Sequence, residues 1–304
     1  MKLKKQITIC IAMATCMLTF TGCSHSQTSS LANELHFSLD DILNLTISYD
    51  EEKIAFFESE SDELIIKEYM TTNKNSYHAK INQDSNSIKI SEGSKPLFKG
   101  SFSRYIEVYL PTSYHENLTV TTTDGNIDFS NIEILLSSLH SDSTTGTIHF
   151  NVAKAKDIYL SSTSGTLKLG DLKANQIKIE TTSGNVTCDK IDGNVTYTST
   201  SGNANIKSAV GSGNYRINNS GNLNIKYAKV TDNLSFFNKN DDINIILPKD
   251  LEFEFIATTK NGLISTNFKR YITLEKRIAK GIIGSHPDIT INVETNNGNI
   301  NVTR

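Results

Sequence analysis

The amino-acid sequence predicts an all-β protein, and within that class a β-solenoid built from rungs of about 19 residues. A short glycine-centred phrase recurs along the chain, apolar and polar residues alternate on both sides of that glycine, and no helical period is evident after the N-terminus. Small polar residues precede the glycine and an apolar-polar-apolar step follows it. The glycines are Gly125, Gly146, Gly165, Gly184, Gly202, Gly221, Gly262 and Gly298.

These glycines keep a nearly constant spacing. From Gly125 to Gly221 they are separated by 21, 19, 19, 18 and 19 residues, and Asp241 takes the glycine position 20 residues later. Apolar pairs lie at the second and fourth residues after each glycine, and at the seventh and fifth before it. Because side chains of a strand alternate between its two faces, each rung is expected to hold two short strands with inward apolar pairs, joined by turns. Glycine suits such turns because it adopts positive φ without steric cost.

An antiparallel meander or barrel also has two strands and two turns in each repeat. We favour the solenoid because the same residue type recurs at the same position, as stacking in register produces. One repeat is expected to slip: its apolar pair, Tyr215 and Ile217, lies one residue closer to the glycine than in the other repeats. The nearby Gly211-Ser212-Gly213 suggests a bulge or a wider turn there.

Three segments are expected: a signal peptide over 1–22, a polar tether over 23–34, and a β-repeat domain over 35–304 with regular rungs from about 118 to 302. Residues 35–117 are expected to form an irregular N-terminal β region of the same domain.

Weaker fits to the repeat extend the pattern at both ends. Glu52 and Asn86 take the glycine position in the N-terminal region, and Gly281 is expected to mark a degenerate rung between Gly262 and Gly298. Because the chain ends at Arg304, just after the last rung, an unpaired strand edge is expected there.

The N-terminus has the pattern of a secretion signal. Lys2, Lys4 and Lys5 precede an apolar run from Ile7 to Phe20 that is short for a membrane span. The following Thr21-Gly22-Cys23 resembles the lipobox of bacterial lipoproteins, although Phe20 stands where leucine is usual. That resemblance implies cleavage between Gly22 and Cys23 and acyl chains on Cys23. The protein is then expected on the extracytoplasmic face of the cell membrane, held there by its lipid.

The net charge of the chain argues against nucleic acid as a partner. The net charge is −3, which disfavours binding to nucleic acid. A local basic patch is interpreted as a solvated loop; it consists of Lys269, Arg270, Lys276, Arg277 and Lys280.

Cys188 is the one cysteine of the repeat domain and falls on an inward position, so we expect a buried apolar filler and not a nucleophile.

No group of residues predicts catalysis, a metal or a cofactor. The seven histidines form no pair at ligand spacing, and no Gly-x-Ser-x-Gly nucleophile motif is present. The outward positions of the repeat are mostly Thr, Asn and Lys, without the converging acids that glycan cleavage requires. We therefore expect no enzymatic activity, no metal site and no cofactor.

The repeat domain resembles the bacterial DUF4097 family of β-strand repeat proteins, labelled putative adhesins. The resemblance rests on the serial Thr-Ser-Gly-Asn turns, on Leu110-Pro111 and Leu247-Pro248, and on the closing stretch from Ile291 to Ile300, and it covers roughly residues 35–304. It implies a solenoid-like domain on a secreted or membrane-anchored protein and supplies no catalytic residues.

Three functions fit the sequence, in descending order of support. The first is a lipid-anchored surface module that binds an envelope protein or a glycan. The second is an accessory part of an envelope-stress system that acts through a membrane partner, because some members of the resembled family sit among envelope-stress genes. The third and most remote is a carbohydrate-active β-helix enzyme.

Overall fold

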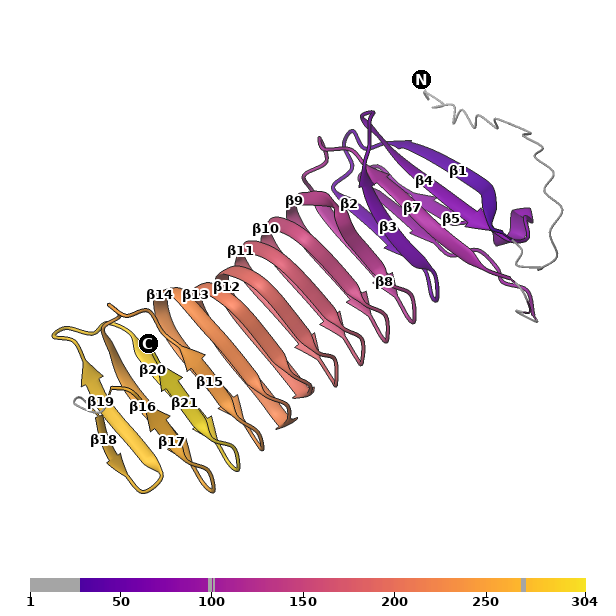
Figure 1. The fold of residues 1–304 in the computed structure, drawn as a ribbon. Coiled ribbons are helices and arrows are strands. Elements are labelled where there is room, and N and C mark those ends of the chain that lie inside the picture. Colours follow the sequence, from indigo (N-terminus) through magenta and orange to yellow (C-terminus); the bar gives the residue numbers. More distant parts are fainter. Residues whose placement is uncertain (1–27, 98–99, 101, 269–271) are drawn as a thin grey trace.

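The computed structural model describes residues 28–97, 100, 102–268 and 272–304. Within them the chain forms 21 strands in one hydrogen-bonded network and one short 3-10 helix, η1 (Asn75–Tyr77). The strands stack along one axis into a rod (Figure 1). The all-β class is confirmed. None of the described segments is a helix of the length and apolarity that a membrane crossing needs.

The body of the rod is a parallel β-solenoid. Its strands are β8 (Asn117–Thr122), β9 (Ile127–Ser143), β10 (Ile148–Ser162), β11 (Leu167–Thr181), β12 (Val186–Ser201), β13 (Ala204–Ser220) and β14 (Leu223–Asn238). Each pairs in parallel with the next one in the chain. This pairing confirms the solenoid and excludes the meander.

The path within a rung differs from the expected two short strands separated by two turns. Each of β9 to β14 is one strand of 15 to 17 residues that bends midway, so that its two halves face a common core. Figure 1 shows these strands arching over one side of the rod and returning through a narrow turn on the other. We call the arched side the bend corner and the narrow turn, which contains the glycine, the glycine corner.

The core lies between the two halves of the rungs, as the alternation predicts. Side chains at the predicted inward positions form rows along the rod, and one row begins with the stacked rings of Phe56, Phe129 and Phe150, whose centroids are 4.2 and 4.4 Å apart. Cys188 continues this row after Leu169 and is 1% exposed, which confirms its expected burial.

The repeat before Gly221 is irregular, as expected, but its apolar pair was assigned wrongly. Tyr215 and Ile217 are fully buried, yet they align with Tyr197 and Ser199 of the preceding rung, so Gly213 takes the first position of the pair. Relative to the preceding rung, the extra residue lies between Ile217 and Ser220, beyond the Gly211-Ser212-Gly213 stretch that was expected to hold it. That stretch stays in register with the preceding rung and shifts only against the following one.

The N-terminal end combines two rungs with an antiparallel cap. Its strands are β1 (Ser30–Ser38), β2 (Asn44–Ser48), β3 (Lys53–Glu58), β4 (Glu63–Met70), β5 (Lys80–Gln83), β6 (Ser87–Ser91) and β7 (Arg104–Leu110). The rung β2–β3 lies between the rungs β6–β7 and β8–β9, so the outermost rung is not the first in the chain. Antiparallel β4 and β1 extend one sheet beyond β7, and antiparallel β5 extends the other beyond β6.

Two expectations for this region have different outcomes. Glu52 does occupy a glycine position, directly under Gly125 in the next rung. Asn86 does not: Ile88 and Ile90 align with the apolar pair before the turn of the β2–β3 rung, and Ile81 lies in antiparallel β5. The error arose because a period of two looks the same in either half of a rung.

The first strand also begins earlier than the expected domain. β1 starts at Ser30, inside the stretch 23–34 that was expected to be a tether. It pairs with β4 along its length, and its residues Leu35 and Phe37 pack against the core.

The C-terminal end is interleaved in the same way. Its strands are β15 (Ile243–Ile246), β16 (Phe253–Thr259), β17 (Ile264–Thr266), β18 (Ile272–Glu275), β19 (Ile278–Ile283), β20 (Thr290–Thr295) and β21 (Ile300–Thr303). The rung β20–β21 is inserted between the second half of β14 with β15 on one side and the rung β16–β17 on the other. Antiparallel β19 and β18 then extend one sheet beyond β16.

This arrangement corrects two expectations. The strand edge predicted at Arg304 is absent, because β21 has a parallel partner on each side. Gly281 marks no rung: it lies within β19, where the pairing is antiparallel. The residues between Gly262 and Gly298 therefore supply a cap and the return path to an inserted rung.

Glycine recurs at the turns mainly because adjacent rungs approach closely there. A methyl group at Gly146 would overlap the carbonyl oxygen of Gly125, and the same holds for each later turn glycine against the residue beneath it. Among the eight glycines, only Gly202 and Gly221 have left-handed φ values, 125° and 131°. The expected role of positive φ is therefore confined to these two turns.

We expect Gly165→Ala to lower the free energy of unfolding by about 2 kcal/mol, because its methyl group would force apart two hydrogen-bonded rungs. Thr163→Ala, exposed in the same turn, is the matched control and should change stability by less than about 0.5 kcal/mol. Urea unfolding followed by circular dichroism measures both. Equal effects of the two changes would contradict the close-approach argument.

Candidate functional site

The residues predicted from sequence as sites fall into two groups. The turn glycines form one line along the glycine corner, where each lies against the backbone of its neighbour, so their role is structural. Cys23 and Gly22, the predicted lipid attachment and cleavage positions, lie outside the described residues. Burial raises the pKa of the Cys188 thiol to about 12, which keeps it protonated and unreactive at neutral pH.

A buried polar row supports the glycine corner, and the sequence analysis missed it. Three residues before each glycine position stands a Ser, Thr or Asn that is almost fully buried, apart from the slipped repeat. Ser143 and Ser162 accept hydrogen bonds of 2.9 Å from the amides of Gly146 and Gly165. The invariant small polar residue at this spacing was the signal, since a buried donor or acceptor needs a partner.

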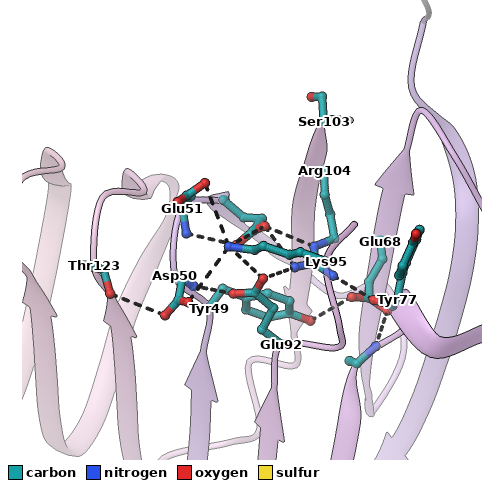
Figure 2. Close-up of polar contacts among 12 residues, drawn as sticks. Tyr49, Asp50, Glu51, Glu68, Tyr77, Glu92, Lys95, Ser103, Arg104 and Thr123 are labelled. Atoms are coloured by element: carbon teal, nitrogen blue, oxygen red, sulfur yellow. Dashed lines mark hydrogen bonds and ion pairs between the residues drawn. The ribbon is translucent and has the colours of Figure 1, made fainter. Parts of the chain in front are cut away.

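At the N-terminal end, a cluster of charged residues replaces the glycine turn (Figure 2). Glu52 stands at the glycine position of the β2–β3 rung, and Lys95 and the fully buried Arg104 side chain lie beside it. Arg104 donates hydrogen bonds of 3.2 and 2.9 Å to Glu52 and one of 2.7 Å to the carbonyl oxygen of Tyr77. Glu92 Oε1 lies 2.5 Å from Arg104 Nη2 and 2.7 Å from Lys95 Nζ.

A second buried carboxylate ties the cap strands to this cluster. Glu68 accepts hydrogen bonds from the hydroxyl of Tyr49 at 3.2 Å, the amide of Asn33 at 2.7 Å and the backbone amide of Ala79 at 2.8 Å. Burial, and then the charge of Glu68, raises the pKa of Tyr49 well above its usual value. Tyr49 is therefore a neutral donor throughout the physiological range.

The cluster is suited to closing the rod. Lys95 Nζ lies within 4 Å of four carboxylates, so its ammonium occupies the space that a free cation would take. A cavity of about 220 Å³ adjoins it. Within the described ranges, no three His, Cys, Asp or Glu residues are arranged to hold a metal ion. We interpret the cluster as a structural lock.

A larger concave surface lies on the bend corner. This groove has a volume of about 780 Å³ and crosses six successive strands, β9 to β14. Its floor is formed by Leu136, Ala155, Ala174, Gly193 and Gly211. The side chains of this floor become smaller toward the C-terminal end, from leucine through alanine to glycine.

The sides of the groove carry different chemistry. The residues before the floor positions include Lys154 and Lys173, which form ion pairs of 2.5 and 3.7 Å with carboxylates of adjacent rungs. The residues after the floor positions are short and polar in every strand except β10, where Lys156 follows Ala155. They are Ser137, Asn175, Asn194 and Ser212, joined by Thr231 from β14.

These five polar side chains make no hydrogen bond to the described part of the chain. The asparagines at the glycine corner behave differently, since Asn240, Asn297 and Asn261 are linked from rung to rung by side-chain bonds of 2.7 Å. The groove therefore contains repeated polar groups that the fold leaves unengaged.

The model of the DUF4097 family, described as Toastrack, matches residues 42–303. No curated protein matches the chain.

Several solved structures are similar over nearly their whole length. One is a "putative cell adhesion protein" from Clostridium sporogenes, with 15% identity, a TM-score of 0.26, and coverage of 89% of this chain and 98% of that one. "Putative adhesins" from Bacteroides fragilis and Parabacteroides distasonis are each 11% identical, with TM-scores of 0.43 and 0.39 and coverage of 89% and 96%.

Removing the Arg104 side chain should destabilise the N-terminal end of the rod. Arg104→Ala leaves Glu52 and Glu92 without their strongest partner in a buried site, so we expect a loss of about 3–5 kcal/mol. Lys154→Ala removes the exposed pair with Glu133 and should cost at most about 1 kcal/mol. Denaturant unfolding of both variants measures the difference, and a cost of less than 1 kcal/mol for Arg104→Ala would refute the structural lock.

Proposed function

The chain belongs to the DUF4097 family, and we propose that it is a non-enzymatic binding module held on the extracytoplasmic face of the cell membrane by a lipid on Cys23. The rod supplies the recognition surface and the lipid supplies the location. The proposal combines the groove of the bend corner with the lipobox-like Gly22-Cys23 of the sequence.

The groove is the observation that carries the binding role. It presents a short polar group in each of its strands except β10, and adjacent rungs are about 4.8 Å apart. A ligand that runs along the rod from β11 to β14 meets a neutral donor and acceptor at each step, which suits a linear polymer. An envelope glycan or an extended protein segment has this form.

The distribution of polar groups also supports binding in preference to catalysis. Catalysis needs different groups that converge on one reacting atom. Here the residues with notable chemistry are used by the fold: Arg104 and Lys95 are held in the N-terminal lock and Cys188 fills the core. The groove instead presents a line of short neutral groups beside Lys154 and Lys173, which are already paired with carboxylates.

The anchor and the rod are compatible in their placement. Ser30, the first residue of β1, follows Cys23 by seven residues, a reach of at most about 25 Å when fully extended. A lipid on Cys23 therefore keeps the N-terminal cap close to the bilayer. The groove begins several rungs further along and is accessible from the outside.

Filling the groove should abolish binding without unfolding the rod. We expect the double variant Asn175→Arg, Asn194→Arg to reduce binding to isolated cell-wall polymers or to whole cells at least about tenfold, since each side chain projects where a ligand would lie. Asn205→Arg, exposed on the outer face of β13, is the matched control. Pull-down and surface plasmon resonance measure binding. Absence of binding by the unchanged protein, or equal effects of the variants, would refute the proposal.

Removing the anchor should change location and leave the fold intact. Cys23→Ala is expected to move the protein from the membrane fraction to the soluble fraction, because the acyl chains provide the binding free energy. Fractionation followed by immunoblotting measures this, with Cys188→Ala as the control for loss of a cysteine. Unchanged membrane association of Cys23→Ala would rule out the lipid anchor.

A further inference from the structure

The two sheets of the rod end differently at the C-terminal end. One sheet continues past β16 through β19 and β18, whereas the other stops at β17. Figure 1 shows β18 and β19 as the last elements at this end of the rod. One side of the core therefore extends two strands beyond the other.

A series of backbone hydrogen bonds shows that β17 is an open edge. In each rung the amide two residues after the glycine position donates to the next rung, in a row that begins at Ile54 and ends with Ile300 donating to Leu263. The nine bonds measure 2.8–3.0 Å. The next donor in the row is the amide of Ile264, and it has no acceptor among the described residues.

The core is open at the same point. In the rungs from Ile127 to Ile300, the residue two positions after the glycine position is at most 1% exposed. Ile264 takes the same position in its rung and is only partly buried. Leu274 of the overhanging β18, paired opposite the buried Ala279, is 57% exposed. An added strand would cover such a set of apolar side chains and pair with the free backbone groups.

The charges around this edge indicate the chemistry of that strand. Lys260, Lys276 and Arg277 are exposed and have no carboxylate at ion-pair distance within the described residues. Arg277 reaches the turn that leads into β17, where its Nη1 lies 3.4 Å from Asn261 Oδ1. Two copies of this edge would bring like charges together, so self-pairing is disfavoured.

We propose that the β17 edge is a docking site for an extended acidic segment of a partner protein, which adds one more strand to the sheet. The segment contributes two apolar side chains that are separated by one residue. Both face the core, where they contact Ile264 and the overhanging β18. An acidic residue before them lies next to Asn261 and meets Arg277. This site is separate from the groove and does not depend on the function proposed for it.

The chain itself offers a probe with the required pattern. Residues 123–130, Thr-Asp-Gly-Asn-Ile-Asp-Phe-Ser, have an apolar pair and carboxylates at Asp124 and Asp128. A fluorescent peptide of this sequence should bind the full chain saturably. The same peptide with lysine in place of both aspartates should bind at least about tenfold more weakly, and more so at low salt.

Two variants of the protein test the site directly. Ile264→Pro removes the backbone amide that points away from β21, a position where an edge strand tolerates proline. This variant should lose peptide binding while its thermal unfolding temperature changes by only a few degrees. The double variant Lys276→Glu, Arg277→Glu leaves the backbone intact and should invert the preference toward the lysine peptide. Equal binding of both peptides, or full binding by a folded Ile264→Pro variant, would overturn the proposal. So would peptide-independent dimerisation through this edge, or no binding at all, in which case the cations only shield the edge.

Discussion

The structure depends on the contact between the backbones of adjacent rungs at the glycine corner. The carbonyl oxygen of one turn lies where the Cβ atom of the next would be, and the hydrogen bonds from rung to rung hold that distance. The buried Ser and Thr hydroxyls then satisfy the glycine amides. Most rungs therefore keep a glycine at the turn and a buried Ser, Thr or Asn three residues before it, while Glu52 and Asp241 take the glycine position in two of them.

This constraint explains why the middle of the rod could be predicted. Gly125 to Gly221 fix the period, and the alternation around them fixes which side chains enter the core, including Cys188 and Tyr215. The second turn of each rung was not predicted correctly, because residues such as Ala155 and Gly193 bend a continuous strand and break no pattern. The groove follows from that bend and was therefore missed.

The ends could not be read from the sequence because strand order is not encoded in a local pattern. The stretch Ile300–Thr303 has the same alternation as every other rung, yet it lies inside the stack, between β15 and β17. The lock around Arg104 joins residues from 49 to 104 that have no common motif. Only the tertiary pairing brings such groups together.

A solenoid has the same unpaired edges wherever its stack ends, so each end needs its own solution. At the N-terminal end both sheets are extended by antiparallel strands, and Arg104 and Glu68 fasten those strands to the first rungs. At the C-terminal end only one sheet is extended, and Lys260, Lys276 and Arg277 beside β17 have no carboxylate at ion-pair distance among the described residues. The buried cluster around Arg104 pairs charges of both signs, whereas these three cations face solvent without a carboxylate partner. A partner strand that supplied acidic residues would complete this end as the antiparallel strands complete the other.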